Sequence, residues 1–145
     1  MLVKTRSAIS TSVAAIVVIV LIAVGAGAYY YYTQAPGEPK KSIGIVFDVG
    51  GRGDLSFNDM AALGADNAAQ QYNLDTQYLQ SASSSDYVTN LQNLASQSNP
   101  PVLIVAVGFL MTDAVNQTAR QFPKQNFTII DGFVPGLPNV LSVLF

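Results

Sequence analysis

The sequence contains no cysteine and no histidine, and these absences exclude several kinds of chemistry. Thiol catalysis, zinc sites built from cysteine and histidine, and acid–base catalysis by an imidazole all need side chains that this chain does not have. A lipid anchor on cysteine is excluded as well, while the redox compartment stays undetermined. We therefore expect no catalytic residue, no metal site and no cofactor.

Charged residues are also few, at 11% of the chain, with a formal net charge of −2. Two of the seven basic residues, Lys4 and Arg6, precede a long apolar segment, and all nine acidic residues follow it. The sequence shows no cluster of lysine and arginine that could contact successive phosphates. We therefore expect no binding to nucleic acid, because such binding depends on a basic surface.

The apolar segment predicts a transmembrane or signal-anchor helix at residues 9–32, after a short basic N-terminus at 1–8. Twenty helical residues span about 30 Å, the thickness of the hydrocarbon layer. Four tyrosines, Tyr29–Tyr32, follow at the position of an interfacial aromatic belt. The basic residues lie on the N-terminal side, which places the N-terminus in the cytoplasm and the rest of the chain outside.

Three fates of this segment are open. It can remain as an anchor, or a signal peptidase can cut after Ala28, where small residues alternate. It also resembles pilin-like signals, which are cut after a short basic leader, here near Arg6. We favour retained attachment to the membrane. Residues 33–41 contain Pro36, Gly37 and Pro39 and are expected to form a linker.

Residues 42–145 are expected to form one α/β lobe, because short apolar runs alternate with amphipathic stretches. This alternation predicts a parallel sheet with helices on both faces. The predicted strands are Ser42–Phe47, Leu74–Leu79, Val102–Val107, Phe127–Ile130 and Val140–Phe145. The predicted inward helical faces are Phe57, Met60, Ala61, Gly64 and Ala68; Tyr87, Val88, Leu91, Leu94 and Ala95; and Leu110, Met111, Ala114, Val115 and Phe122.

The glycine-rich stretch 48–59 is predicted to be the first strand-to-helix turn. Ser56 is predicted to cap the helix, with Asp59 as the acid of a capping box. Asp48 ends the first strand, so its carboxylate is expected to point into the crevice beyond the strand ends, where ligands bind in such sheets. Asp131 and the serines at 83–85 follow other strands and end at the same edge.

These strand ends suggest how a small ligand could bind. Phe57 or Phe109 could stack on a flat base, and a carboxylate could accept bonds from two sugar hydroxyls. Other interpretations remain open: Phe57 also fits the buried face of its helix, Asp113 also fits a first-turn helix acid, and Asp131 also fits a turn.

Several motifs occur in the order found in one known family. They comprise Asp48, Gly50, Gly51, Ser56, Phe57 and Asn58, then Asp86-Tyr87, Val107–Ala114, Phe127–Asp131 and Pro138–Val140. Over residues 42–145 the sequence thereby resembles the basic membrane protein family, the purine-nucleoside-receptor-like solute-binding proteins of ABC importers. The resemblance implies ligand-binding roles for Asp48, Phe57, Asn58 and Asp113, to which the strand-end argument adds Phe109.

The resemblance also implies a fold and partners. It implies the N-terminal lobe of a type I periplasmic-binding-protein-like domain, a nucleoside-like ligand, and ABC permease subunits as partners. Members of that family continue into a second lobe that closes on the ligand. The expectation is therefore that the chain is a fragment, or the product of a split or truncated gene, which lacks that lobe.

The sequence leaves two other functions open. One is an extracellular sensor or adhesion lobe that binds a partner protein, and the other is an α/β hydrolase-type enzyme that uses the turn at Asp48. The tripeptide Arg52-Gly53-Asp54 spells an adhesion motif, but any glycine-rich turn can produce it. The hydrolase motif Gly-x-Ser-x-Gly does not occur, which disfavours the enzyme. Two glycosylation sequons, at Asn116 and Asn126, have meaning only if the lobe is outside a cell that glycosylates its proteins.

Overall fold

The computed structural model describes residues 10–34 and 39–145. The chain divides into two units, Met1–Glu38 and Pro39–Phe145, which are taken one at a time. Lys4 and Arg6, on which the predicted orientation in the membrane depends, lie outside the described residues, as do residues 35–38 of the predicted linker.

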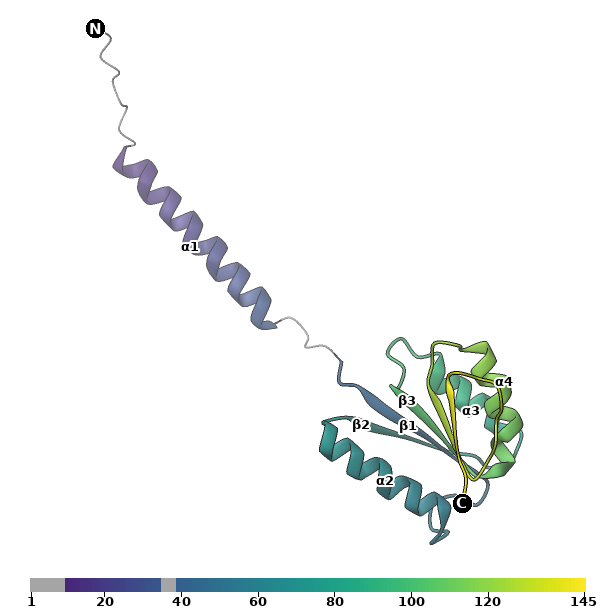
Figure 1. The fold of residues 1–145 in the computed structure, drawn as a ribbon. Coiled ribbons are helices and arrows are strands. Elements are labelled where there is room, and N and C mark those ends of the chain that lie inside the picture. Colours follow the sequence, from purple (N-terminus) through teal and green to yellow (C-terminus); the bar gives the residue numbers. More distant parts are fainter. Residues whose placement is uncertain (1–9, 35–38) are drawn as a thin grey trace. The chain divides into compact units, whose positions relative to one another are not determined.

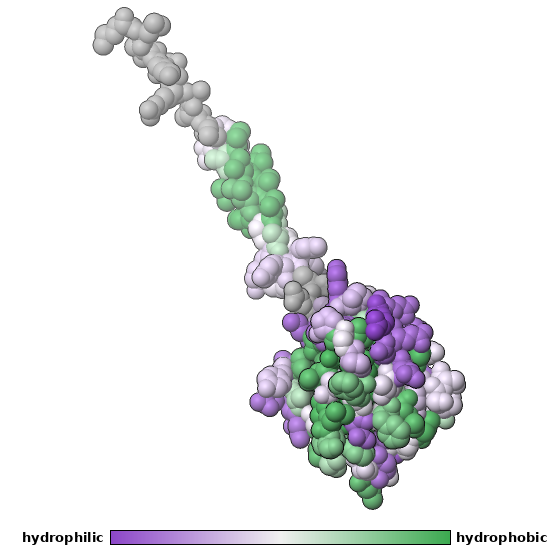
Figure 2. Space-filling view, turned by 45° about the vertical axis from the view of Figure 1, so that its right-hand side comes forward, coloured by the Kyte–Doolittle hydropathy of each residue, from purple (hydrophilic) through white to green (hydrophobic). Residues whose placement is uncertain are grey.

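The first unit contains one helix, α1 (Thr11–Gln34), which is long and apolar enough to cross a membrane, as judged by length and composition. None of its residues is buried, and hydrophobic side chains cover the middle of the helix in Figure 2. A helix that is apolar on all sides has no polar face to turn toward water. The helix continues to Gln34, so Thr33 and Gln34 are helical and not part of a linker as predicted.

The second unit is built on a parallel sheet of five strands in the order β2-β1-β3-β4-β5. The strands are β1 (Ser42–Phe47), β2 (Asp75–Gln80), β3 (Leu103–Val107), β4 (Phe127–Ile130) and β5 (Val140–Val143). Every neighbouring pair is parallel. The predicted α/β fold is confirmed, and each strand lies within two residues of its predicted bounds.

Helices cover the two faces of this sheet unequally. Helix α2 (Phe57–Tyr72) lies on one side, and α3 (Asp86–Ala95) and α4 (Thr112–Gln121) lie together on the other (Figure 1). A short 3-10 turn, Phe109–Met111, leads from β3 into α4. The face under α3 and α4 holds the larger core, which includes Leu91, Ile104 and Phe127. The face under α2 holds a second core around Ile45 and Phe47.

The inward face predicted for α3 is confirmed. The one predicted for α2 is right only in part, because Ala61 and Ala68 pack against the core while Phe57, Met60 and Gly64 are exposed. The buried residues of α2 are Asn58, Ala62 and Ala65, whereas Met60 is 59% exposed. The small side chains of the two alanines let the helix lie close against the sheet, which turns the larger side chains sideways. Leu110, predicted inside with α4, is exposed and lies in the 3-10 turn that precedes the helix, where Met111 alone is buried.

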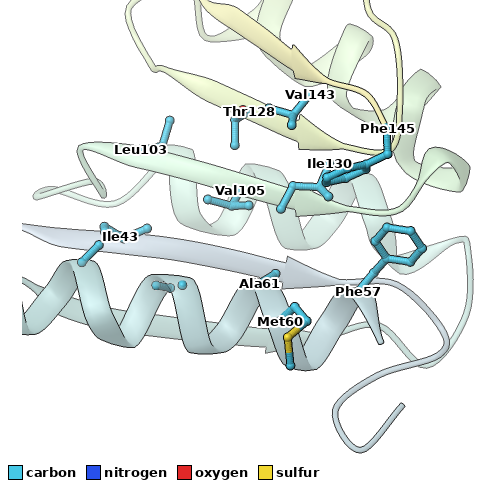
Figure 3. A pocket seen from close by; sticks show the side chains of 13 residues that line it. Ile43, Phe57, Met60, Ala61, Leu103, Val105, Thr128, Ile130, Val143 and Phe145 are labelled. Atoms are coloured by element: carbon cyan, nitrogen blue, oxygen red, sulfur yellow. The ribbon is translucent and has the colours of Figure 1, made fainter. Parts of the chain in front are cut away.

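Part of the sheet beside α2 is left uncovered. A groove of about 400 Å³ runs between α2 and strands β3, β4 and β5 (Figure 3). Its walls are almost entirely apolar and include Met60, Val105, Ile130 and Val143. Parallel sheets are normally covered on both faces. An apolar surface is therefore exposed to solvent along this groove.

Candidate functional site

The loop between β1 and α2 is shaped by two carboxylates. Asp54 accepts hydrogen bonds from the backbone N–H groups of Ser56 (2.9 Å), Asn58 (3.0 Å) and Asp59 (3.1 Å). Asp54 therefore satisfies the N–H groups at the start of α2. The predicted capping role of Ser56 is wrong, because its side chain makes no capping hydrogen bond.

Asp59 also stabilises the loop, but it does not complete the predicted capping box. Its carboxylate accepts hydrogen bonds from the N–H groups of Gly53 (2.9 Å) and Leu55 (3.0 Å). Leu55 has a φ of 51°, a left-handed conformation that costs energy for a residue with a side chain. The bond to Asp59 helps to hold this conformation, so the acid sits inside the loop and fixes its path.

The same loop fixes Arg52. Its Nε lies 3.2 Å from Asp59 Oδ1, and its guanidinium carbon lies 5.8 Å from the ring centroid of Phe47 and 5.6 Å from that of Tyr78. A cation over aromatic faces is attracted by the ring quadrupoles. Both charged residues of the Arg52-Gly53-Asp54 tripeptide are thus engaged by the lobe itself, which does not favour its recognition as an adhesion motif.

Asp48 lies directly after β1 and is held from several sides. Its Oδ1 accepts hydrogen bonds from the Gly50 N–H (2.9 Å) and from Asn58 Nδ2 (2.8 Å). Its backbone carbonyl accepts a hydrogen bond from Gln80 Nε2 at 2.7 Å, at the end of β2. Among the described residues, Asp48 Oδ2 accepts no hydrogen bond. One carboxylate oxygen is therefore fixed and the other is available.

Gly108 follows β3 and lies beside Asp48 Oδ2, where only a residue without a side chain leaves room for this oxygen. A Cβ atom placed on Gly108 would lie only 2.8 Å from Asp48 Oδ2, and the φ of this residue is 101°. Any larger residue would press on the carboxylate and would also strain the backbone. The ends of β1 and β3 thus meet at Asp48.

Asn58, predicted to touch the ligand, is only 2% exposed and lies beneath the loop. Its Nδ2 donates to Asp48 Oδ1 and also to Asp54 Oδ2 (3.2 Å). Its Oδ1 is buried and has no hydrogen-bond partner among the described residues. In this structure Asn58 connects the two carboxylates and so positions Asp48.

The remaining predicted residues lie at the same edge of the sheet. Phe109 follows Gly108 and is 63% exposed, and Asp113 is exposed in the first turn of α4. Phe57 is 44% exposed, and its ring lies at the mouth of the apolar groove, 5.9 Å from that of Phe145 (Figure 3). Asp131 has a φ of 59°, which fits a turn residue.

Sequence reasoning missed two residues that shape the site. Gln80 holds the carbonyl of Asp48, and Asp54 holds the start of α2. An acid just before a predicted helix is a recognised capping signal, so Asp54 could have been found from the sequence. No sequence pattern singles out Gln80, because its role depends on the pairing of β1 with β2.

The two bracing carboxylates give the lobe a predictable response to acid. Desolvation raises the pKa of Asp54, but hydrogen bonds from Ser56, Asn58 and Asp59 outweigh it and leave this pKa below the ordinary 3.8. Hydrogen bonds from Gly53 and Leu55 likewise lower the pKa of Asp59. Because both values are lower in the folded state, the stabilisation is present above about pH 4 and is lost as pH falls through the folded values.

We therefore expect the melting temperature of the lobe to fall when the pH is lowered from 5 to 3. Asp59→Asn should melt lower than the parent at pH 7 and should lose less on acidification, because its contribution has already been removed. Asp113→Asn is the matched control, since Asp113 accepts no hydrogen bond among the described residues. If Asp59→Asn and Asp113→Asn have the same acid response, the bracing role of Asp59 is wrong.

Comparison with known proteins places this lobe among characterised families. Residues 41–145 match the family model described as ABC transporter substrate-binding protein PnrA-like. An uncharacterized lipoprotein of Pyrococcus furiosus is 43% identical over 114 residues, which cover 78% of this chain and 28% of the relative. The ABC transporter nucleoside-binding protein BmpA of Lactococcus lactis is 36% identical over 105 residues, covering 70% of this chain and 29% of the relative.

A solved structure agrees with these relatives. An ABC transporter solute-binding protein from Aeropyrum pernix superposes with a TM-score of 0.67 at 40% identity, over 72% of this chain and 28% of that one. The chain thus spans less than a third of the length of the relatives described here. The matched region holds the whole sheet and the Asp48 loop. The chain therefore belongs to the PnrA-like family of ABC transporter substrate-binding proteins, which is a family of binding proteins and not of enzymes.

Proposed function

We propose that this chain captures a nucleoside-like ligand outside the cell for an ABC importer. The observation that carries the proposal is Asp48, whose carboxylate is fixed through one oxygen while the other stays available at the ligand-binding edge of the sheet. The name of the Lactococcus lactis relative, a nucleoside-binding protein, supports the choice of ligand. ABC permease subunits are the proposed partners, and no nucleic acid is involved.

The proposed contacts use the residues at this edge. Asp48 Oδ2 accepts a hydrogen bond from a hydroxyl or N–H group of the ligand. Phe109 or Phe57 stacks on the flat base, and Asp113 offers a second carboxylate at the start of α4. Asn58 acts on the ligand through Asp48, to which it donates a hydrogen bond of 2.8 Å.

The proposed organisation has four parts. Residues 1–8 are a basic N-terminus, 9–32 a membrane anchor whose helix continues to Gln34, 35–41 a linker, and 42–145 the first lobe of the binding domain. The second wall of the site is supplied by a further lobe, as the greater length of the relatives suggests. Ligand binding by residues 42–145 alone is then much weaker than binding by both lobes together.

The test is calorimetric titration with purine nucleosides. The protein is prepared as the chain itself and as a chimaera that adds the remaining part of the Aeropyrum pernix relative. The chimaera should bind a nucleoside and return it intact, because the lobe offers no thiol or imidazole. Absence of binding to any nucleoside would contradict the ligand class, and release of free base or sugar would favour the enzyme instead.

Attachment to the membrane gives a separate prediction. With α1 as the anchor and the basic residues on its N-terminal side, the lobe should lie outside the cell. Protease added to intact cells should remove the lobe, while a cytoplasmic marker protein stays whole. A lobe that is digested only after lysis would show that the proposed orientation is wrong.

A further inference from the structure

The lobe contains two sequons for N-linked glycosylation, and the structure separates them clearly. Asn116 lies inside helix α4, and its Oδ1 accepts a hydrogen bond of 2.9 Å from Arg120 Nε. The threonines of both sequons, Thr118 and Thr128, are buried, so the two sites differ at their asparagines. Acceptor asparagines occur in surface loops. Asn116 therefore sits in an unsuitable position, on a regular helix and tied to its neighbour.

Asn126 has the opposite surroundings. It is exposed in the turn that leads into β4. Its backbone carbonyl is held by the Ile104 N–H (3.0 Å) and by Gln125 Nε2 (3.0 Å), so the backbone is fixed here. Within residues 10–34 and 39–145, the side-chain amide of Asn126 takes part in no hydrogen bond. The amide nitrogen can therefore carry a substituent without breaking any contact of the fold.

The surface beside Asn126 suits a sugar. Asn126 lines an open pocket of about 330 Å³, together with residues that include Pro138, Asn139 and the exposed Leu141. A pyranose ring has an apolar face, which can lie over proline and leucine, and hydroxyls, which can reach an amide. The pocket is open to solvent, so a longer chain of sugars could continue outward.

The position of Asn126 also keeps a glycan away from the ligand. Asn126 precedes β4, whereas Asp48 follows β1. Because all strands are parallel, these two residues lie at opposite edges of the sheet. A glycan at Asn126 thus stays at the edge where the chain enters β1, and the candidate ligand edge remains open.

We propose that Asn126 carries an N-linked oligosaccharide and that Asn116 does not. The donor is a lipid-phosphate-linked oligosaccharide, used by a transferase on the outer side of the membrane. A bond forms between Asn126 Nδ2 and the anomeric carbon of the first sugar, while the bond from that carbon to the phosphate oxygen breaks. The lipid phosphate leaves, and the amide proton passes to a base of the transferase. The inference depends on the proposed function only in placing the lobe outside the cell.

The test uses the full chain purified from the membranes of its own cells. Mass spectrometry of tryptic peptides, which separate the two sequons at Arg120, should find a hexose-containing mass increase on the peptide with Asn126 and none on the peptide with Asn116. On a gel, Asn126→Gln should migrate faster than the parent, whereas Asn116→Gln and Thr128→Ser, which keeps the sequon, should migrate with it. An unmodified Asn126 peptide, or sugar on Asn116, would overturn the inference.

Protease treatment of the same intact cells separates this inference from the proposed function. If the lobe is digested from outside and Asn126 is unmodified, the glycan assignment is wrong while the location stands. If the lobe is protected and Asn126 is unmodified, both the location and the glycan are wrong. Nucleoside titration of Asn126→Gln should give the affinity of the parent, because the residue lies at the far edge of the sheet.

Discussion

Asp48→Asn is expected to weaken nucleoside binding at least tenfold while changing the melting temperature little. A hydrogen bond to a charged group contributes about 1.5–3 kcal/mol, and about 1.4 kcal/mol corresponds to a factor of ten in affinity. The asparagine can keep an oxygen toward the N–H of Gly50 and toward Asn58 Nδ2, so the turn should survive. What is lost is the negative charge and the acceptor at Oδ2. Calorimetric titration and thermal melting of the two-lobed chimaera measure both quantities.

The matched control for this substitution is Asp75→Asn. Asp75 is an exposed acid at the start of β2, paired with Lys40 at 2.8 Å, and it lies at the opposite edge of the sheet from Asp48. The control should bind the nucleoside as tightly as the parent. If Asp48→Asn also retains full affinity, the proposed site is wrong. If its melting temperature falls together with its affinity, Asp48 is a structural residue of the turn.

Gly108→Ala should weaken binding and lower stability, because it introduces both a steric clash and backbone strain. The new methyl group would lie 2.8 Å from Asp48 Oδ2, so the carboxylate must move. The φ of 101° is also unfavourable for alanine, at a cost of about 1–3 kcal/mol. Each kcal/mol lowers the melting temperature of a domain of this size by roughly 4–8 °C. We expect a loss of affinity like that of Asp48→Asn, together with a clear fall in melting temperature.

Gly136→Ala introduces the backbone strain without the steric clash. Gly136 also has a positive φ, of 72°, but a Cβ there would meet no atom within 4 Å. This variant should lose stability from backbone strain and keep its affinity for the nucleoside. Equal affinities for Gly108→Ala and Gly136→Ala would mean that the position of the Asp48 carboxylate does not matter for binding.

The three central strands, β1, β3 and β4, could be predicted from the sequence because most of their residues are buried. Every residue of β1 is buried, and β3 and β4 are nearly so, which produces short apolar runs that stand out from their surroundings. The helices α3 and α4 bring buried residues such as Leu91 and Val115 inward with regular helical spacing. These patterns are local, so they can be recognised in the sequence without knowing the order of the strands in the sheet.

The details of the site were less predictable, because they depend on which atom reaches which partner. Ser56 and Asp54 are both good capping residues, and only the path of the glycine loop decides in favour of Asp54. From the sequence, Asn58 is predicted to contact a ligand, yet it is buried between the carboxylates of Asp48 and Asp54. A buried polar side chain such as Asn58 adds nothing to the apolar periodicity of a helix. The sequence therefore predicts an inward face of α2 that includes Met60 and leaves out Asn58.

The strand order has a further consequence for how the lobe folds. Strand β1 comes first in the sequence, yet it lies between β2 and β3, so that Ile43 pairs with Leu103. Such distant partners meet only after the chain between them has been arranged, and closing that loop costs entropy before any contact offsets it. We expect slower folding than for a helical bundle of the same length. Until β3 docks, β1 exposes an open, apolar edge, and this interval is when the chain is most open to misassociation with other copies.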